Sequence, residues 1–264
     1  MHTANYFVRH RPNPGSRLRL FCFPYAGGSA LNFLSWHKSF GPEVEICALQ
    51  LPGRGARLAE TPHAELEPLV RTLAREIRPF LDRPYAFFGH SLGGLLAFEL
   101  ARRCALDGLP AAERLFASGC EAPQCRKTPK YLCRMPDAEL IAALRDYNGT
   151  PPEVLENKEL MNLCLPFIRA DFALVENYAY REGPPLDVPI TVLAGRDDPG
   201  VAADSVPEWR RETAAGCRVE WFDGDHFFIQ SRRSEVIRCV ADELKPVLQE
   251  AMPMSRKTVW VHAR

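Results

Sequence analysis

The strongest constraint on the fold is an alternation between short apolar runs and longer segments with a helical period. Six runs rich in aromatic and β-branched residues are predicted as strands: 17–24, 44–52, 84–89, 114–119, 189–195 and 218–224. Most of these runs are apolar on both faces, as expected for parallel strands covered by helices on both sides. Strands that alternate with helices predict an α/β protein with a doubly wound, mostly parallel sheet.

Outside the segment 121–183, three segments are predicted to be helical. In the first, apolar residues recur at helical spacing along one face: Leu66, Leu69, Val70, Leu73, Ile77 and Phe80. We expect a second helix from Ser91 to about Leu106 and a carboxy-terminal helix over roughly Ser234 to Leu248.

The segment 121–183 breaks the alternation. It contains no convincing strand, but it has helical stretches at 137–147 and 158–178, separated by the sequence NGTPP. This is too long for a simple crossover, so we predict an inserted helical lid over the carboxyl edge of the sheet. Residues 1–264 are otherwise expected to form a single domain. The tail after Met252 has no clear period and is expected to be disordered or appended.

Composition narrows the class of protein. The 33 basic and 33 acidic residues give a formal net charge of zero, which disfavours a nucleic acid or a membrane surface as the main partner. The amino terminus lacks the apolar core of a signal peptide, so we expect a cytoplasmic protein. Nine cysteines without a C-x-x-C pair favour reduced thiols over disulfides or a metal site. A cysteine nucleophile is the less favoured alternative.

The sequence GHSLG at 89–93 follows one of the predicted strands. A strand that turns sharply into a helix strains the residue at the turn, and glycines two positions before and after it avoid steric collisions. The pattern predicts Ser91 as a nucleophile at the amino end of a helix, where the helix dipole favours negative charge. The pentapeptide alone is a weak signal. The apolar strand before it and the glycine-containing helix after it favour a nucleophile over an ordinary turn.

A serine nucleophile needs a base and an acid that orients the base. In a sheet of this kind the partners follow in the order serine, acid, histidine, after later strands. The sequence RDDPG after the strand 189–195 offers Asp197 and Asp198, and GDHFF offers His226. Asp198 is favoured because its spacing from Gly195 fits a G-x-x-D arrangement. Asp197 is expected to cap or solvate the turn.

The remaining candidates fit these roles less well. Five histidines lie near the chain ends or have no strand ahead of them: His2, His10, His37, His63 and His262. His90 adjoins Ser91, but its side chain is predicted to point away from the site. Asp223 and Asp225 flank His226 and are predicted to form the turn.

The oxyanion hole requires two backbone N–H groups, one from the residue after the nucleophile and one from a loop after an early strand. These are predicted as Leu92 and Ala26, with Tyr25 as the alternative to Ala26. The loop is PYAGGSA at 24–30. Its glycines also fit an ordinary strand-to-helix turn. A phosphate-binding loop is disfavoured because neither G-x-x-x-x-G-K-[ST] nor G-x-G-x-x-G occurs.

With these residues assigned, the chain resembles the type II thioesterases of the α/β-hydrolase superfamily. These are the editing enzymes that accompany nonribosomal peptide and polyketide synthases, and the chain is also similar to the related medium-chain fatty-acyl thioesterase. The matching stretches run in the expected order: LFCFPYAGGSA (20–30), LQLPGRGAR (49–57), YAFFGHSLGG (85–94), residues 148–178, LAGRDDP (193–199) and GDHFFI (224–229). Together they are far more specific than the pentapeptide.

The resemblance implies hydrolysis of acyl or aminoacyl thioesters on the phosphopantetheine arm of a carrier protein, without a metal or cofactor. It implies a triad of Ser91, Asp198 and His226, with Ala26 and Leu92 as oxyanion donors. The lid would form the acyl chamber and the entrance for the arm, and the enzyme is expected to be a monomer.

Two departures and two rival interpretations accompany the resemblance. Asp225 stands where the family often has glycine, and Cys120 and Glu121 stand where basic residues are common, which weakens a carrier contact there. One rival interpretation is an esterase, lipase or peptidase acting on small molecules. The other is a non-catalytic, hydrolase-like binding module, which would lack a member of the triad.

Overall fold

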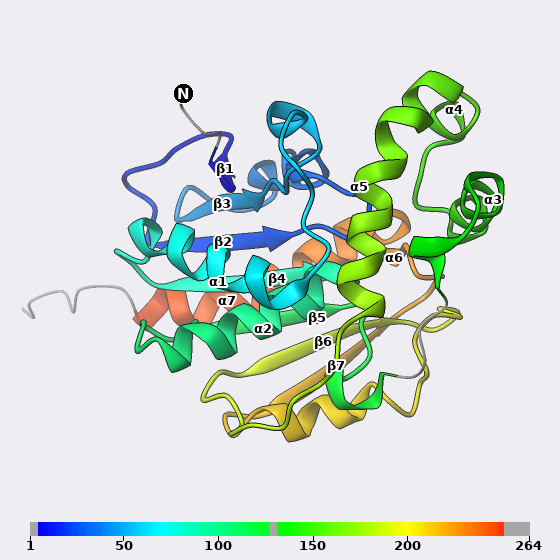
Figure 1. The fold of residues 1–264 in the computed structure, drawn as a ribbon. Helices are drawn as coiled ribbons and strands as arrows, with labels where there is room; N and C mark the ends of the chain where they lie inside the picture. Colours follow the sequence, from blue (N-terminus) through cyan, green and yellow to red (C-terminus); the bar gives the residue numbers. More distant parts are fainter. Residues whose placement is uncertain (1–4, 127–130, 251–264) are drawn as a thin grey trace, which may run out of the picture.

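A seven-stranded sheet runs through residues 5–126 and 131–250, the part of the chain that this computed structural model describes (Figure 1). Its order is β1-β3-β2-β4-β5-β6-β7, and only β1 runs antiparallel to its neighbour. The strands are β1 (Phe7–Arg9), β2 (Leu18–Phe23), β3 (Val44–Leu49), β4 (Tyr85–His90), β5 (Arg114–Ser118), β6 (Ile190–Gly195) and β7 (Cys217–Phe222). The prediction of a doubly wound, mostly parallel sheet is confirmed.

The six predicted strands all form, and β1 is the strand that the sequence did not predict. It has three residues, too few for a period of two to be recognised, and it pairs with β3 through Phe7 and Leu49. The run 44–52 was predicted too long, because the strand ends at Leu49.

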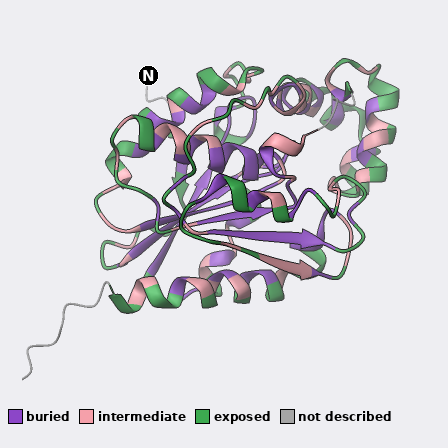
Figure 2. Cartoon of the chain, turned by 90° about the horizontal axis from the view of Figure 1, so that it is seen from below, coloured by how far each residue is buried: buried purple, intermediate pink, exposed green. Residues whose placement is uncertain are grey.

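Helices cover both faces of the sheet, as predicted. On one face lie α1 (Leu66–Ile77) and α2 (Leu92–Leu106), packed against aromatic residues such as Phe21 and Phe87. On the other lies α7 (Arg233–Glu250), with two short 3-10 helices, η1 (Ala30–Phe33) and η2 (Trp36–Lys38). Figure 2 shows most strands buried between these layers, whereas the edge strand β7 is largely only partly buried.

Between β5 and β6 the chain forms helices instead of a simple crossover. These are α3 (Asp137–Tyr147), α4 (Pro152–Leu155) and α5 (Lys158–Glu176), and residues 121–126 and 131–183 contain no strand. Their buried residues form a hydrophobic cluster of their own that includes Leu144, Met161 and Phe167. In Figure 1 the three helices stand at the side of the sheet toward which the parallel strands point.

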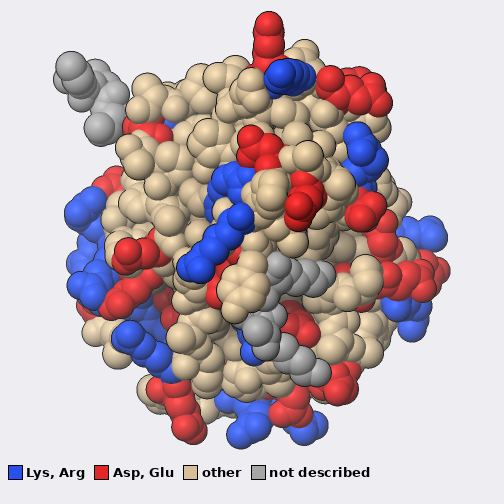
Figure 3. Space-filling view, turned by 45° about the vertical axis from the view of Figure 1, so that its right-hand side comes forward, with Lys and Arg blue, Asp and Glu red and all other residues tan. Residues whose placement is uncertain are grey.

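The surface carries both signs of charge. Figure 3 shows acidic and basic side chains interspersed over one face of the molecule. Among the described residues, no helix has both the length and the apolar character required to cross a bilayer. All nine cysteines are free thiols. The tail after Met252, for which we predicted disorder or an appended segment, lies outside the described residues.

Candidate active site

The turn from β4 into α2 has the strained geometry that the GHSLG sequence predicts. Ser91 adopts φ 56° and ψ −116°, a region that residues with a side chain rarely enter. A Cβ atom on Gly89 would lie 2.0 Å from the carbonyl oxygen of Gly93. A Cβ atom on Gly93 would lie 2.0 Å from the carbonyl oxygen of Phe23. The glycines therefore let the helix start close against both strands, which presents Ser91 at the carboxyl edge of the sheet.

The structure brings Ser91, His226 and Asp198 together in one hydrogen-bonded chain. The Nε2 atom of His226 lies 3.0 Å from the Oγ atom of Ser91, and its Nδ1 atom lies 2.7 Å from Oδ2 of Asp198. A carboxylate only accepts hydrogen bonds, so Nδ1–H donates to Asp198 and Nε2 is left to accept the Ser91 hydroxyl proton. This tautomer is the one that general-base catalysis requires.

The two candidate acids, Asp197 and Asp198, differ in burial and in hydrogen bonding. The Asp198 side chain is fully buried, and its second oxygen accepts a hydrogen bond of 2.8 Å from the N–H of Gly200. Asp197 is exposed, and its N–H donates to the carbonyl of Gly224. Of the two aspartates, Asp198 is the one hydrogen-bonded to the imidazole, so it is the one that can hold the ring in orientation.

The predicted oxyanion donors are two backbone N–H groups near Ser91. Leu92 is the first residue of α2, where an N–H has no acceptor within the helix. Ala26 lies in a turn closed by a 2.8 Å bond from the N–H of Gly28 to the carbonyl of Tyr25. In the part of the chain that the structure describes, neither the N–H of Ala26 nor that of Leu92 donates to a protein acceptor. Both groups are therefore available to a ligand oxygen.

The alternative donor is the backbone N–H of Tyr25, which likewise donates to no acceptor among the described residues, so Tyr25 stays an alternative to Ala26. The Tyr25 side chain makes contacts of its own. Its hydroxyl accepts hydrogen bonds from Asn32 and Gln230, at 2.9 and 3.1 Å. Its ring meets that of Phe227 edge to face, at a centroid distance of 4.9 Å. Tyr25 thereby connects the oxyanion loop to the segment that carries His226.

The expectation that His90 points away from the site is wrong. Its ring packs against the ring of His226 at a centroid distance of 5.2 Å, and its Nδ1 atom lies 2.9 Å from Oγ of Ser118. His90 follows Phe88 on the face of the sheet that α7 covers, and the loop after β7 folds back over that same face. Burial, and secondarily the electrostatic interaction with the neighbouring His226 ring, hold the pKa of His90 well below its usual value, so the His90 ring is neutral.

The acidic neighbours of His226 shape its loop. The carboxylate of Asp225 accepts a 2.8 Å hydrogen bond from the N–H of Phe227, which is an Asx-turn. Asp223 is exposed and forms an ion pair with Arg196 at 3.2 Å. Neither contributes its side chain to the Ser91–His226–Asp198 chain.

Sequence reasoning did not find that the helical segment contacts the histidine loop directly. The Tyr147 ring lies 6.1 Å from that of His226, and Phe227 lies 5.3 Å from it. A Cβ atom on Gly149 would lie 2.0 Å from Phe227, so only glycine fits there without displacing the ring. The turn residues NGT at 148–150 are the only sequence signal of this contact.

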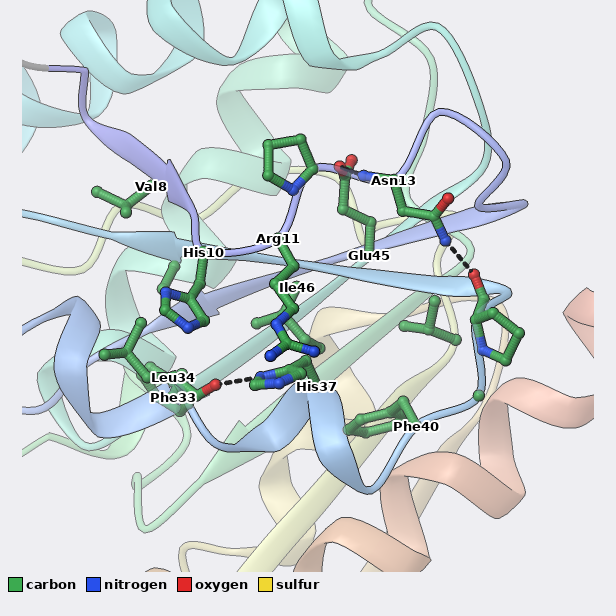
Figure 4. Close-up of a pocket in the computed structure, with 15 residues that line it drawn as sticks. Val8, His10, Arg11, Asn13, Phe33, Leu34, His37, Phe40, Glu45 and Ile46 are labelled. Atoms are coloured by element: carbon green, nitrogen blue, oxygen red, sulfur yellow. Dashed lines mark hydrogen bonds between the residues drawn. The ribbon is translucent and has the colours of Figure 1, made fainter.

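The pocket in Figure 4 lies away from this site. It is a cavity of about 330 Å³ beside β1 and β3, lined by residues that include Val8, His37 and Phe40, and no member of the candidate triad lines it. A cavity of about 550 Å³ lies nearer, where Tyr25 faces the 148–152 turn. Among the described residues, no cluster of three or more metal-binding side chains occurs.

A serine on a strained strand-to-helix turn, joined to histidine and aspartate at the carboxyl edge of this sheet, defines a serine hydrolase of the α/β-hydrolase fold. Residues 18–244 match the family model described as the thioesterase domain. The chain belongs to the thioesterase family.

Similar proteins agree with this assignment. The gramicidin S biosynthesis protein GrsT of Aneurinibacillus migulanus is 42% identical over 245 residues, which is 92% of this chain and 95% of that one. LgrE of Brevibacillus parabrevis, named a linear gramicidin dehydrogenase, is 38% identical over 232 residues, 87% of this chain and 88% of that one. The solved structure of the type II thioesterase BorB, from the borrelidin biosynthetic cluster, matches with a TM-score of 0.85 and 35% identity, covering 93% of this chain and all of that one. The family resemblance seen in the sequence is confirmed.

Proposed function

We propose that this protein is a type II thioesterase, which hydrolyses acyl or aminoacyl thioesters from the phosphopantetheine arm of carrier proteins. Its role is to clear stalled or incorrectly primed groups in nonribosomal peptide or polyketide biosynthesis. The observation that carries the proposal is the continuous Ser91–His226–Asp198 hydrogen-bonded chain within a member of the thioesterase family. GrsT is named for gramicidin S biosynthesis and BorB is named a type II thioesterase of the borrelidin biosynthetic cluster, and both resemble this chain over nearly its whole length.

In the first half of the reaction, His226 takes the proton of Ser91 as the serine oxygen attacks the thioester carbonyl. Asp198 stabilises the imidazolium that forms. The N–H groups of Ala26 and Leu92 donate to the oxyanion. The tetrahedral adduct then collapses, the C–S bond breaks, and the departing thiol takes the proton from His226.

In the second half, the acyl group is bound to Ser91 as an ester. His226, neutral again, takes a proton from water as the water oxygen attacks this ester. The same two N–H groups stabilise the second oxyanion. When the C–O bond to Ser91 breaks, the serine oxygen recovers the proton and the free acid leaves.

We also propose that residues 121–183 are a lid within a single domain of residues 1–264. The hydrophobic cluster among α3, α4 and α5 supports this, because the segment has packing of its own. The contacts of Tyr147 and Gly149 with the histidine loop support it as well, since lid position and site geometry are then coupled. The acyl chamber would lie beneath this segment.

The name of LgrE raises a redox function for a close relative. The present chain lacks the G-x-G-x-x-G sequence that binds a dinucleotide, and its site has the hydrogen bonds of a hydrolase. A thioesterase therefore remains the better proposal. We further propose a cytoplasmic monomer with no nucleic acid or membrane partner. Light scattering of the purified protein tests the monomeric state.

The decisive experiment compares hydrolysis rates for acetyl-, medium-chain and aminoacyl-carrier proteins, the same groups on pantetheine, and matched oxygen esters. We expect kcat/KM to be highest for the carrier-bound thioesters. Preference for free oxygen esters would contradict the proposal in favour of a small-molecule esterase. A Ser91→Ala variant that keeps its rate, or a native protein that a fluorophosphonate does not label, would indicate a non-catalytic module.

A further inference from the structure

A buried ion pair joins the loop after β3 to helix α5. The guanidinium of Arg54 binds the carboxylate of Asp171 through two hydrogen bonds of 2.6 and 2.7 Å. The two side chains are 4% and 2% exposed, and the Phe167 ring covers the guanidinium at 4.3 Å. The residues are 117 positions apart, so the pair exists only because the fold brings α5 across the carboxyl edge of the sheet.

This pair also binds the backbone of the oxyanion loop. The N–H of Gly27 donates to Oδ2 of Asp171 at 2.8 Å, and Arg54 donates to the carbonyl of Gly28 at 2.9 Å. Gly27 follows Ala26 directly and adopts φ +79°, the conformation of the third residue of a type II turn. The pair therefore holds the two residues that follow Ala26, Gly27 through Asp171 and Gly28 through Arg54.

The chemistry of the pair favours a role beyond packing. Removing two charges from water is expensive, and an ion pair recovers that energy only with good geometry and further hydrogen bonds. Here the further bonds go to the turn that holds a proposed oxyanion donor. A lone carboxylate at Gly27 would also repel the oxyanion that forms beside Ala26, and the charge of Arg54 cancels this repulsion.

We propose that Arg54 and Asp171 are positioning residues for the oxyanion hole. They hold the turn from Tyr25 to Gly28 so that the Ala26 N–H faces the carbonyl oxygen of the substrate, and they connect this turn to the lid helix α5. The inference rests on the proposed function, because it assigns these residues to the hydrolysis reaction at Ser91.

The test is a double variant, Arg54→Met with Asp171→Leu, which removes both charges together. Apolar replacement of a whole buried pair leaves no unpaired charge, so the protein should still fold. We expect kcat to fall by ~10- to 100-fold with KM changed by less than ~3-fold, because loss of an oxyanion donor acts on the transition state. Affinity for a trifluoromethyl ketone, which Ser91 converts to a tetrahedral adduct, should fall in parallel. Affinity for the product acid should not change.

The matched control is Arg19→Met with Glu45→Leu, which removes another buried ion pair at the amino ends of the strands. This control variant should keep the wild-type kcat. The comparison then distinguishes the general effect of losing a buried ion pair from the specific loss of the oxyanion turn's positioning. An intermediate variant, Asp171→Asn, keeps an oxygen that can accept the Gly27 N–H, and its kcat should lie between those of the wild type and the double variant.

Normal kcat and normal affinity for the ketone in the folded double variant would overturn the inference. If the double variant does not fold, normal kcat in Asp171→Asn would overturn it. Failure of the proposed function is distinguishable, because it would appear as thioester hydrolysis that persists in Ser91→Ala, whatever residues stand at 54 and 171.

Discussion

The imidazole rings of His90 and His226 pack against each other, with centroids 5.2 Å apart and planes tilted by 49°. His90 is completely buried, whereas His226 contacts the Ser91 hydroxyl. Two charged imidazoles at this separation would repel each other, so a neutral His90 allows His226 to carry the charge that catalysis demands. His90, the last residue of β4, thus contributes to the electrostatic environment of His226.

This arrangement predicts a pH dependence of stability. Burial lowers the pKa of His90 below its unfolded value of about 6.5, so below that pH the unfolded chain binds more protons than the folded one. The free energy of unfolding should therefore fall as the pH drops from about 7 toward 5, by up to ~1.4 kcal/mol per pH unit from this group. Urea unfolding of the wild type and of His90→Gln across this range measures the effect.

The variant His90→Gln should show a shallower slope, because the glutamine side chain does not titrate. Ser118→Ala is the control, since it removes the hydrogen-bond partner of His90 but keeps the buried imidazole, and its slope should remain. Equal slopes in the wild type and His90→Gln would contradict a proton linkage at His90.

The adjacent residues Asp197 and Asp198 offer a paired test of the triad. Asp198→Asn should lower kcat by about three to four powers of ten, because an amide holds the imidazole in the wrong tautomer. Asp197→Asn should stay near the wild-type rate, since Asp197 is exposed and makes its hydrogen bond through the backbone. Steady-state rates on one acyl-pantetheine substrate provide the comparison. Equal losses in the two variants would remove Asp198 from its assigned role.

The turn at Ser91 predicts a steric effect at Gly93. In Gly93→Ala the new methyl group would lie 2.0 Å from the backbone oxygen of Phe23, which cannot move without disrupting β2. We expect a loss of at least ~3 kcal/mol in the free energy of unfolding, the upper range for overpacking, together with loss of fluorophosphonate labelling. Gly15→Ala is the control, because its nearest contact would be an ordinary 3.4 Å. Wild-type stability in Gly93→Ala would show that the turn is looser than described.

Much of the sheet and the three residues of the proposed triad could be predicted because their signals are local. Each core strand is apolar on both faces, as in Phe87 and Phe88, and the residues at 91, 198 and 226 follow strands in the expected order. The acid was the harder choice, because neighbouring residues of a loop differ in direction, and the burial that favours Asp198 depends on the packed structure.

The features that could not be predicted depend on segments meeting in space. β1 is stabilised by its pairing with β3 and has no pattern of its own. The contact of His90 with His226 depends on the loop after β7 folding back. Arg54 and Asp171 are 117 positions apart, and nothing in the sequence distinguishes them from the many other arginines and carboxylates that could form such a pair.

The contact between Gly149 and Phe227 yields a last prediction, on the coupling between the proposed lid segment and the site. In Gly149→Ala the added methyl group would lie 2.0 Å from the Phe227 ring, which is held between Tyr25 and His226. Displacement of the Phe227 ring should disturb His226, which it contacts, so we expect kcat to fall by ~10-fold, since displacements of about 1 Å in a catalytic group can cost up to ~100-fold. Adding Phe227→Leu shortens the obstructing side chain and should restore part of the rate in the double variant relative to Gly149→Ala. Losses that simply add in the double variant would mean that the two residues act independently and that this contact does not couple the proposed lid to His226.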